Sequence, residues 1–281
     1  MSDQFKFEFF VPDGVSIEGA LKRTTHLGVG AHQDDLEIMA IDGILKCFKA
    51  QDGFFAGVTV TDGRSSARAG LYAQLSDEEM KTVRYLEQQK AATIGNYSAQ
   101  VMLGYTSSQI KDKRNQKLQN DLEKIIARTS PKIIYTHNLA DKHPVHIAVA
   151  MSVINAIRNL DVNCLPERVY GCEVWRDLDW LSDEEKVIFD CSDHVNLQAA
   201  LLGVFDSQIN GAKRYDTAVI GRRLANATFY EPFETDQYTH LVYAMDLTPL
   251  IKDKKLEIAE FVCEKIMNFK KDVSEKIRAY D

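Results

Sequence analysis

The sequence of 281 residues lacks several features that mark special classes of protein. Its five cysteines are scattered, odd in number and without a Cys-x-x-Cys pair, which argues against a disulfide framework and indicates thiols in a reducing compartment. No apolar run approaches the roughly 20 residues of a membrane span. The N-terminal residues also lack the basic and then apolar pattern of a signal peptide. We therefore expect a cytoplasmic protein with no membrane partner.

The chain has fewer basic than acidic residues. Its 34 Lys and Arg and 41 Asp and Glu give a formal net charge of -7. This balance argues against nucleic acid or an anionic membrane surface as the main partner. The chain has no internal repeat, no low-complexity tract and no linker rich in Pro and Gly. We therefore predict a single domain over residues 1–281, with an N-terminal extension at 1–24 and a C-terminal helix at 250–281.

Strand-like and helix-like segments alternate through the first half of the chain. The predicted strands are residues 27–31, 54–61, 100–103 and 132–135, each followed by a helical segment. This alternation predicts a Rossmann-like α/β fold, in which a mainly parallel sheet has helices on both faces. The second half is less regular, with strands predicted within 167–175 and 238–245.

Both ends of the chain carry apolar patterns of their own. Phe5, Phe7, Phe9 and Phe10 partly alternate with polar residues, which predicts a short strand or an arm packed across the body. Near the C-terminus, apolar residues recur at helical spacing at positions 258, 261, 262, 266, 269, 273 and 277. We expect this stripe to dock on the body of the protein, and contact with a second subunit in a homo-oligomer is the alternative.

A polar turn follows the first predicted strand, where residues 27–31 run into His32, Asp34 and Asp35. Ligands bind at the carboxyl edge of open α/β sheets, and imidazole with carboxylate suits a divalent metal. Asp as a simple helix N-cap is the alternative interpretation. The Gly28-Val29-Gly30 segment could also begin a nucleotide-binding loop, but the third glycine of that motif is absent.

A second cluster follows the fourth predicted strand, where His143 and His146 lie three residues apart at the start of a helix. The first and fourth strands can be neighbours in a doubly wound sheet, so the two clusters would face each other. His32, Asp35 and His146 then supply two imidazoles and one carboxylate, the ligand count of a catalytic zinc with an open position. We predict that they hold Zn²⁺ or another divalent ion, whereas His137 fits no ligand position.

These clusters resemble the two signatures of the LmbE-like (PIG-L) metal-dependent deacetylases. His32-Gln-Asp-Asp35 corresponds to the family's Ala-His-Pro-Asp-Asp, and Asp141-Lys-His-Pro-Val-His146 to its Asp-x-His-Pro-Asp-His. Thr61-Asp62-Gly63, Arg84-x-x-Glu87 and Ser207-Gln208 follow further family motifs in order. The resemblance thus extends from about residue 25 to residue 210. Three positions depart from the pattern: Gln33 replaces a Pro, Val145 an Asp and Phe205 a His.

The resemblance implies a zinc-dependent hydrolase that removes the N-acetyl group of an amino sugar, typically N-acetylglucosamine in a larger small-molecule conjugate. Asp34 would take a proton from water as general base. His143 would stabilise the oxyanion, if protonated, or help to protonate the leaving amine. Arg84 and Asp62 are predicted to contact the substrate.

Two alternatives keep the same metal site but change the activity. One is a metal-dependent amidase that acts on another acyl amide. The other is a metal-binding member without deacetylase activity, an interpretation to which Val145 gives weight because the family's Asp at that position is expected to support a neighbouring His.

Overall fold

The computed structural model describes residues 7–281, so the predictions for Phe5 and the rest of residues 1–6 lie outside the described part. Eight strands form a sheet in the order β1-β4-β3-β2-β5-β6-β8-β7. The pairs β2–β3, β2–β5, β3–β4 and β5–β6 are parallel, and the outer pairs β1–β4, β6–β8 and β7–β8 are antiparallel. The predicted α/β fold with a mainly parallel sheet is therefore confirmed. The strands are β1 (Glu8–Phe10), β2 (His26–Gly30), β3 (Phe55–Thr61), β4 (Ala99–Tyr105), β5 (Ile133–His137), β6 (Arg168–Cys172), β7 (Lys186–Asp190) and β8 (Leu241–Asp246).

The helices connect these strands and differ widely in length. The helix after the His32 turn, predicted as one segment, turns at Ala40, where φ is -101° and ψ is 20°, and so forms two short buried helices. Ser76 and Glu79 make the expected capping box at the start of the long helix that follows β3. The α-helices are α1 (Ile17–Lys22), α2 (Asp35–Met39), α3 (Ile41–Cys47), α4 (Asp77–Ile94), α5 (Ser107–Lys111), α6 (Lys117–Thr129), α7 (Pro144–Asn159), α8 (Val195–Gly203), α9 (Asp206–Ile209), α10 (Tyr215–Phe229), α11 (Thr248–Lys252) and α12 (Ile258–Arg278).

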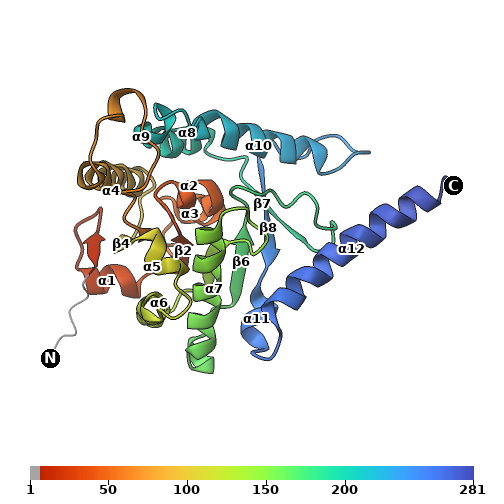
Figure 1. Ribbon diagram of the computed structural model, residues 1–281, viewed down its shortest axis with the longest axis horizontal. Helices are drawn as coiled ribbons and strands as arrows, with labels where there is room; N and C mark the ends of the chain where they lie inside the picture. The colour runs from red at the N-terminus through yellow and green to blue at the C-terminus, as the bar shows by residue number, and fades with distance from the viewer. Residues whose placement is uncertain (1–6) are drawn as a thin grey trace.

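The core has two layers, one on each face of the sheet. Successive side chains of a strand point to opposite faces, so Ala56 and Val58 of β3 face α6 and α7, whereas Phe55 faces α2, α3 and α4. Tyr135 of β5 lies in the same layer as Phe55. Helices α6 and α7 lie on one side of the sheet, and α4 and α8 lie on the other (Figure 1). Because both faces are covered, ligands reach the sheet at its edge.

The two ends of the chain differ in how they pack. Strand β1 pairs with β4, which confirms the predicted N-terminal strand. Helix α12 docks on the body through its first turns only, where Phe261 is buried and Lys265 and Asn268 reach the Glu185 carboxylate at 3.3 and 3.0 Å. The rest of α12 extends away from the body (Figure 1), with Ile266 46% exposed. The expected docking of the stripe on the body is therefore confirmed for its first residues, Ile258, Phe261 and Val262, and not for the rest. Within residues 7–281, no helix is long and apolar enough to cross a membrane.

Gly43 of α3 provides a test of this packing. A Cβ atom there would lie 2.5 Å from Cε2 of buried Tyr135 and 3.2 Å from Cδ2 of Phe55. Gly43→Ala should therefore lower the free energy of unfolding by about 1–3 kcal/mol, although alanine is the better helix former. Gly221→Ala in α10, where a Cβ would meet nothing within 4 Å, should raise it by up to about 1 kcal/mol. Urea unfolding measures both, and a stabilised Gly43→Ala variant would show that α3 packs differently.

Candidate active site

The carboxyl ends of β2 and β5 form the point where the chain changes direction across the sheet. From β2 the chain adds β3 and β4 on one side, and then returns to add β5 on the other side of β2. The sequence predicted that β2 and β5 are neighbours in the sheet, and their parallel pairing confirms this. Such a switch point leaves a crevice outside the strand ends. The turn after β2 and the loop after β5 therefore meet there, although they are more than a hundred residues apart in sequence.

The backbone of the first turn aims its two aspartates in different directions. The His32 N–H donates to Oδ2 of Asp35 at 2.6 Å. Asp34 adopts a left-handed conformation with φ of 90°, which few residue types other than Gly, Asn and Asp adopt readily. Its N–H donates to Oε1 of Gln88 on α4 at 3.4 Å. As a result, the Asp35 side chain lies against the histidines, whereas the Asp34 side chain meets Arg84.

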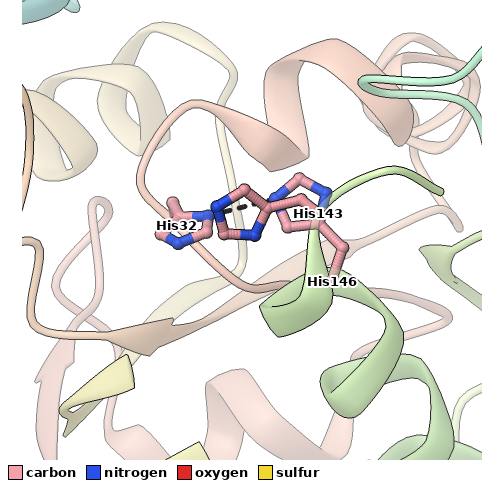
Figure 2. Close-up of side chains that lie close together, drawn as sticks. All are labelled: His32, His143 and His146. Atoms are coloured by element: carbon pink, nitrogen blue, oxygen red, sulfur yellow. Dashed lines mark hydrogen bonds between the residues drawn. The ribbon is translucent and has the colours of Figure 1, made fainter. Parts of the chain in front are cut away.

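Three side-chain atoms converge at the centre of the site. Nδ1 of His32 lies 3.1 Å from Nε2 of His146 and 3.3 Å from Oδ2 of Asp35. Nε2 of His146 lies 3.5 Å from the same Asp35 oxygen. Figure 2 shows the rings of His32, His143 and His146 close together, with His32 and His146 joined by a dashed line. The structure thus brings together the three residues that the sequence predicts as ligands.

This donor set fits a divalent metal ion. Two ligand atoms at about 2.0–2.1 Å from a tetrahedral zinc lie about 3.3 Å from each other, and the three observed separations range from 3.1 to 3.5 Å. Burial alone would raise the pKa of Asp35, but the neighbouring His146 and His137 hold it well below its usual range. Burial lowers the pKa of His146 to about 4, so its imidazole is neutral at physiological pH. A carboxylate and a neutral imidazole are the forms that bind metal.

The far side of the His146 ring faces a second carboxylate. Nδ1 of His146 lies 3.6 Å from Oδ2 of Asp141 and has no hydrogen-bond partner within residues 7–281. Asp141 is itself held by the N–H groups of His143 at 2.8 Å and Trp175 at 3.1 Å. Val145, which stands where the family has an Asp, is buried in the apolar layer instead. Asp141 therefore occupies the position from which a carboxylate orients the His146 ring.

His137, at the end of β5, supports the site from behind. Its Nε2 accepts a hydrogen bond from the Ala31 N–H at 2.9 Å. Because a backbone N–H can only donate, the lone pair of this nitrogen is taken and is not free for a metal. The ring stacks on His146, with 3.8 Å between the ring centroids. By distance alone, His137 could join a ligand group with Asp35 and His146. Because the Nε2 lone pair is already used, the ring instead packs against His146 and holds that ring in place.

Asp34 belongs to a buried network with Arg84. One Oδ atom of Asp34 accepts from Nη2 of Arg84 at 2.9 Å, and Nη1 of Arg84 donates to Glu87 at 2.9 Å. Glu87 in turn accepts from the Ser207 N–H at 2.7 Å and from its hydroxyl at 2.9 Å. Burial raises the pKa of Asp34 to about 6, although the charge of Arg84 opposes this rise. An aspartate with this pKa can both accept and release a proton near neutral pH.

The two predicted substrate contacts, Arg84 and Asp62, line the same cavity but are bound within the protein. Arg84 is 1% exposed, and its two terminal nitrogens contact Gln33, Asp34 and Glu87. The Asp62 carboxylate binds the backbone N–H and the side chain of Arg64. Their polar groups therefore shape the cavity, and a role in substrate binding stays a prediction.

The site opens into a cavity of about 370 Å³. His32, Asp34 and His143 line it, together with residues from the second half of the chain that include Trp175, Lys213, Tyr215 and Arg222. Burial raises the pKa of Tyr215, and the charges of Asp34 and Asp35 raise it further, so its hydroxyl stays protonated. Sequence reasoning missed Lys213, Tyr215 and Arg222. The available signal was the spacing of Tyr215, Ala218 and Arg222, which places them on one face of a helix.

The fold and this cluster define a mixed α/β protein with a site of histidines and aspartates at the switch point of its sheet. Residues 27–157 match the family model PIG-L, described as GlcNAc-PI de-N-acetylase, so this part of the chain is similar to the PIG-L (LmbE-like) family. The resemblance predicted from the motifs is therefore confirmed. No curated protein matches the chain.

Several solved structures share the fold at low sequence identity. The conserved protein TT1542 from Thermus thermophilus is 17% identical with a TM-score of 0.63, over 80% of this chain and 94% of that one. N,N'-diacetylchitobiose deacetylase from Pyrococcus horikoshii is also 17% identical with a TM-score of 0.63, over 82% and 86% of the two chains. GalB, the 4-carboxy-2-hydroxymuconate hydratase from Pseudomonas putida, is 18% identical with a TM-score of 0.61, over 80% and 96%. A deacetylase and a hydratase therefore share this fold.

Metal binding tests the ligand set. The wild type, loaded with Zn²⁺ and desalted, should hold about one ion per chain, as measured by atomic emission. His146→Ala should lose the ion because one of the three converging donors is removed. His194→Asn is a matched control, since His194 is exposed and has a left-handed φ of 53° that Asn tolerates. Equal metal content in the wild type and in His146→Ala would overturn the ligand assignment.

Proposed function

We propose that this protein is a metal-dependent deacetylase that hydrolyses the N-acetyl group of an amino sugar of the N-acetylglucosamine type. The observation that carries the proposal is the convergence of His32, Asp35 and His146 beside the carboxylate of Asp34, which lines the same cavity. The PIG-L match to residues 27–157 supports the same reaction class. The cavity, about 370 Å³, falls in the range of small-molecule sites.

His32, Asp35 and His146 would hold the ion, with Zn²⁺ as the proposed metal. When bound, such an ion lowers the pKa of a bound water and polarises the amide carbonyl. The water oxygen adds to the carbonyl carbon, and Asp34 accepts a proton from that water. The C–N bond then breaks, the proton passes to the departing nitrogen, and the products are acetate and a free amine. Arg84 holds Asp34 in place and favours its ionised form, so that it starts as a base.

Hydrogen-bond donors on the cavity wall complete the proposed machinery. Burial lowers the pKa of His143, and the charge of His32 lowers it further, so the ring is neutral at physiological pH and can donate one N–H. The neutral His143 ring would therefore bind the oxyanion through an N–H hydrogen bond, and not through the positive charge of an imidazolium. The protonated hydroxyl of Tyr215 lies on the same cavity wall and offers a second donor. Both can bind an oxygen that gains charge as water adds.

Replacement of Asp34 tests the base. Asp34→Asn keeps the left-handed backbone and removes only the proton acceptor, so the variant should bind metal like the wild type. Release of acetate from an N-acetylated sugar that the wild type cleaves should fall by about 10²–10⁴-fold. A variant that retains both its metal and its full activity would show that Asp34 is not the base. Acetate is the product to measure, because the fold also occurs in a hydratase.

The pH profile provides an independent test. Because Asp34 must be ionised to act as a base and its pKa is raised to about 6, kcat/KM should rise with pH and level off above that value. A bound cation favours the carboxylate, so the midpoint in the loaded enzyme should lie at or below about 6. Burial lowers the pKa of His146 to about 4, so it remains a ligand across this range. Metal content measured at each pH separates loss of the ion from protonation of Asp34, and a profile that falls with rising pH would contradict the assignment.

A panel of amides distinguishes this proposal from the broader amidase. The panel pairs each N-acetylated amino sugar with its N-propionyl and N-benzoyl counterparts and with an N-acetylated amino acid. A deacetylase of amino sugars should release acetate from the first class at the highest kcat/KM. Faster cleavage of the N-acetylated amino acid would replace the sugar with another acyl amide as substrate. Loaded protein that cleaves none of them would point to a member without this activity.

A further inference from the structure

We propose that the exposed end of α12, from Ile266 onward, is a dimer interface that packs antiparallel against α12 of a second copy of this chain. The end of each helix would then reach the acidic segment 229–238 of the other copy. Both segments lie outside the part of the chain that matches the family model. The inference concerns assembly and does not depend on the proposed deacetylase function.

The apolar stripe of α12 continues without a break from the docked turns onto the exposed end. Its positions are 258, 262, 266, 269, 273, 277 and 280, so the steps between them are 4, 4, 3, 4, 4 and 3. A repeat of this kind averages about 3.67 residues per turn, which keeps the stripe on one side of a nearly straight helix. The body covers the stripe at Ile258 and Val262. The next four positions are exposed: Ile266 by 46%, Phe269 by 42%, Val273 by 39% and Ile277 by 59%.

The stripe lies on a different side of α12 from the side chains that hold the helix on the body. Lys265 and Asn268 contact Glu185, and this side of the helix continues with polar residues at 272 and 276. At about 100° per residue, the stripe lies roughly a quarter of a turn further round the helix. A second helix can therefore lie along the stripe while the contacts with Glu185 stay in place.

The segment that follows α10 offers both apolar side chains and negative charge. Phe229 is 74% exposed and Phe233 is 94% exposed. Residues 229–238 include Glu231, Glu234 and Asp236 but no Lys or Arg. Glu234 and Asp236 accept from neutral side chains, and none of the three acids has a Lys or Arg within 4 Å in the part of the chain that the structure describes. Their charge is therefore available to a partner.

The exposed end of α12 carries charge of the opposite sign. Lys271 and Lys276 pair with acids one turn away in the same helix, at 3.9 and 2.9 Å. Lys270 and Arg278 have no carboxylate within 4 Å among residues 7–281. They are eight residues apart and so lie toward the same side of the helix. Two unpaired cations on α12 thus complement three unpaired acids on segment 229–238.

The two surfaces can satisfy each other only in an antiparallel pair. Figure 1 shows α12 and the end of α10, with the loop that follows it, projecting from the same side of the molecule. A two-fold axis across the exposed end would direct the C-terminus of the partner helix toward this copy, and every contact would occur twice. A parallel pair would instead set Lys270 and Arg278 beside their own copies, and like charges that face each other oppose binding.

A second copy accounts for both surfaces, whereas a lipid membrane would account for one. An anionic bilayer would attract the cations of α12 and take up its apolar stripe. It would repel the acids of segment 229–238 and a chain with a net charge of -7. A second copy supplies the matching stripe and both signs of charge.

Sedimentation velocity of the full chain over a series of concentrations tests the interface. The wild type should form a reversible dimer. Phe269→Glu places a charge in the middle of the exposed stripe and should raise the Kd of the dimer by at least about tenfold. Circular dichroism checks that α12 remains helical, and Val273→Glu, one turn further on, repeats the test if Phe269→Glu does not.

Met267→Glu is the matched control, because Met267 is 56% exposed on the same helix but lies off the stripe. It adds the same charge and should leave the Kd close to the wild-type value. A wild type that stays monomeric throughout the series would overturn the interface. So would a Kd that Phe269→Glu and Met267→Glu change equally.

A charge exchange tests the antiparallel arrangement. Glu231→Lys/Glu234→Lys and Lys270→Glu/Arg278→Glu should each raise the Kd by about fivefold, as expected for exposed ion pairs. The variant with all four changes should recover most of the loss, because opposite charges meet again. If it dimerises no more tightly than either double variant, segment 229–238 is not the contact and the arrangement is wrong.

Vesicles distinguish a membrane from a second copy. The wild type should not co-sediment with vesicles of phosphatidylcholine and phosphatidylserine. Monomeric wild type that binds these vesicles through Phe269, with no dimer at any concentration, would replace the proposed interface with a membrane surface. None of these measurements uses a metal or an acetylated substrate, so their outcome is separate from that of the proposed deacetylase function.

Discussion

The guanidinium of Arg84 links the parts of the chain that build the site. It contacts Gln33 and Asp34 in the turn after β2 and Glu87 one turn further along α4, and Glu87 holds Ser207 at the start of α9. A buried charge that loses its partner destabilises a protein by about 3–5 kcal/mol. Each member of the network therefore constrains the others, and the position of Asp34 depends on residues more than a hundred positions away. The family motifs in this chain thus act as one structural unit.

The strand and helix pattern of the first half was readable because the parallel strands β2, β3, β4 and β5 are largely buried and each is followed by a helix. From this pattern the convergence of His32 and His146 could be predicted, since both follow parallel strands. Residue type alone could not tell whether a polar side chain near the site faces the ligand or the protein. Arg84 was therefore predicted as a substrate contact, but its terminal nitrogens are used by the protein. Lys213, Tyr215 and Arg222 escaped prediction because they lie between the antiparallel strands β7 and β8, beyond the regular strand–helix alternation of the first half.

The loop after β5 shows how one family position can change without loss of the supporting contact. Val145 turns into the apolar layer, where its contacts are with neighbouring helices and strands. Asp141 lies on the Nδ1 side of His146 and is fixed by two backbone N–H groups. Backbone donors do not depend on the side chain at position 145. The departure at Val145, which gave weight to an inactive protein from sequence, is therefore compatible with an oriented His146.

The left-handed backbone at Asp34 limits which residue types can stand there. Asn and Gly adopt this conformation readily, whereas Ala or Glu would add about 1–2 kcal/mol of strain. A loss of activity in an alanine or glutamate variant would thus report a displaced turn as well as a missing carboxylate. The same limit bears on descent within the family. If Asp34 is the base, as proposed, a relative with Asn or Gly at this position keeps the shape of the turn but lacks the proposed proton acceptor.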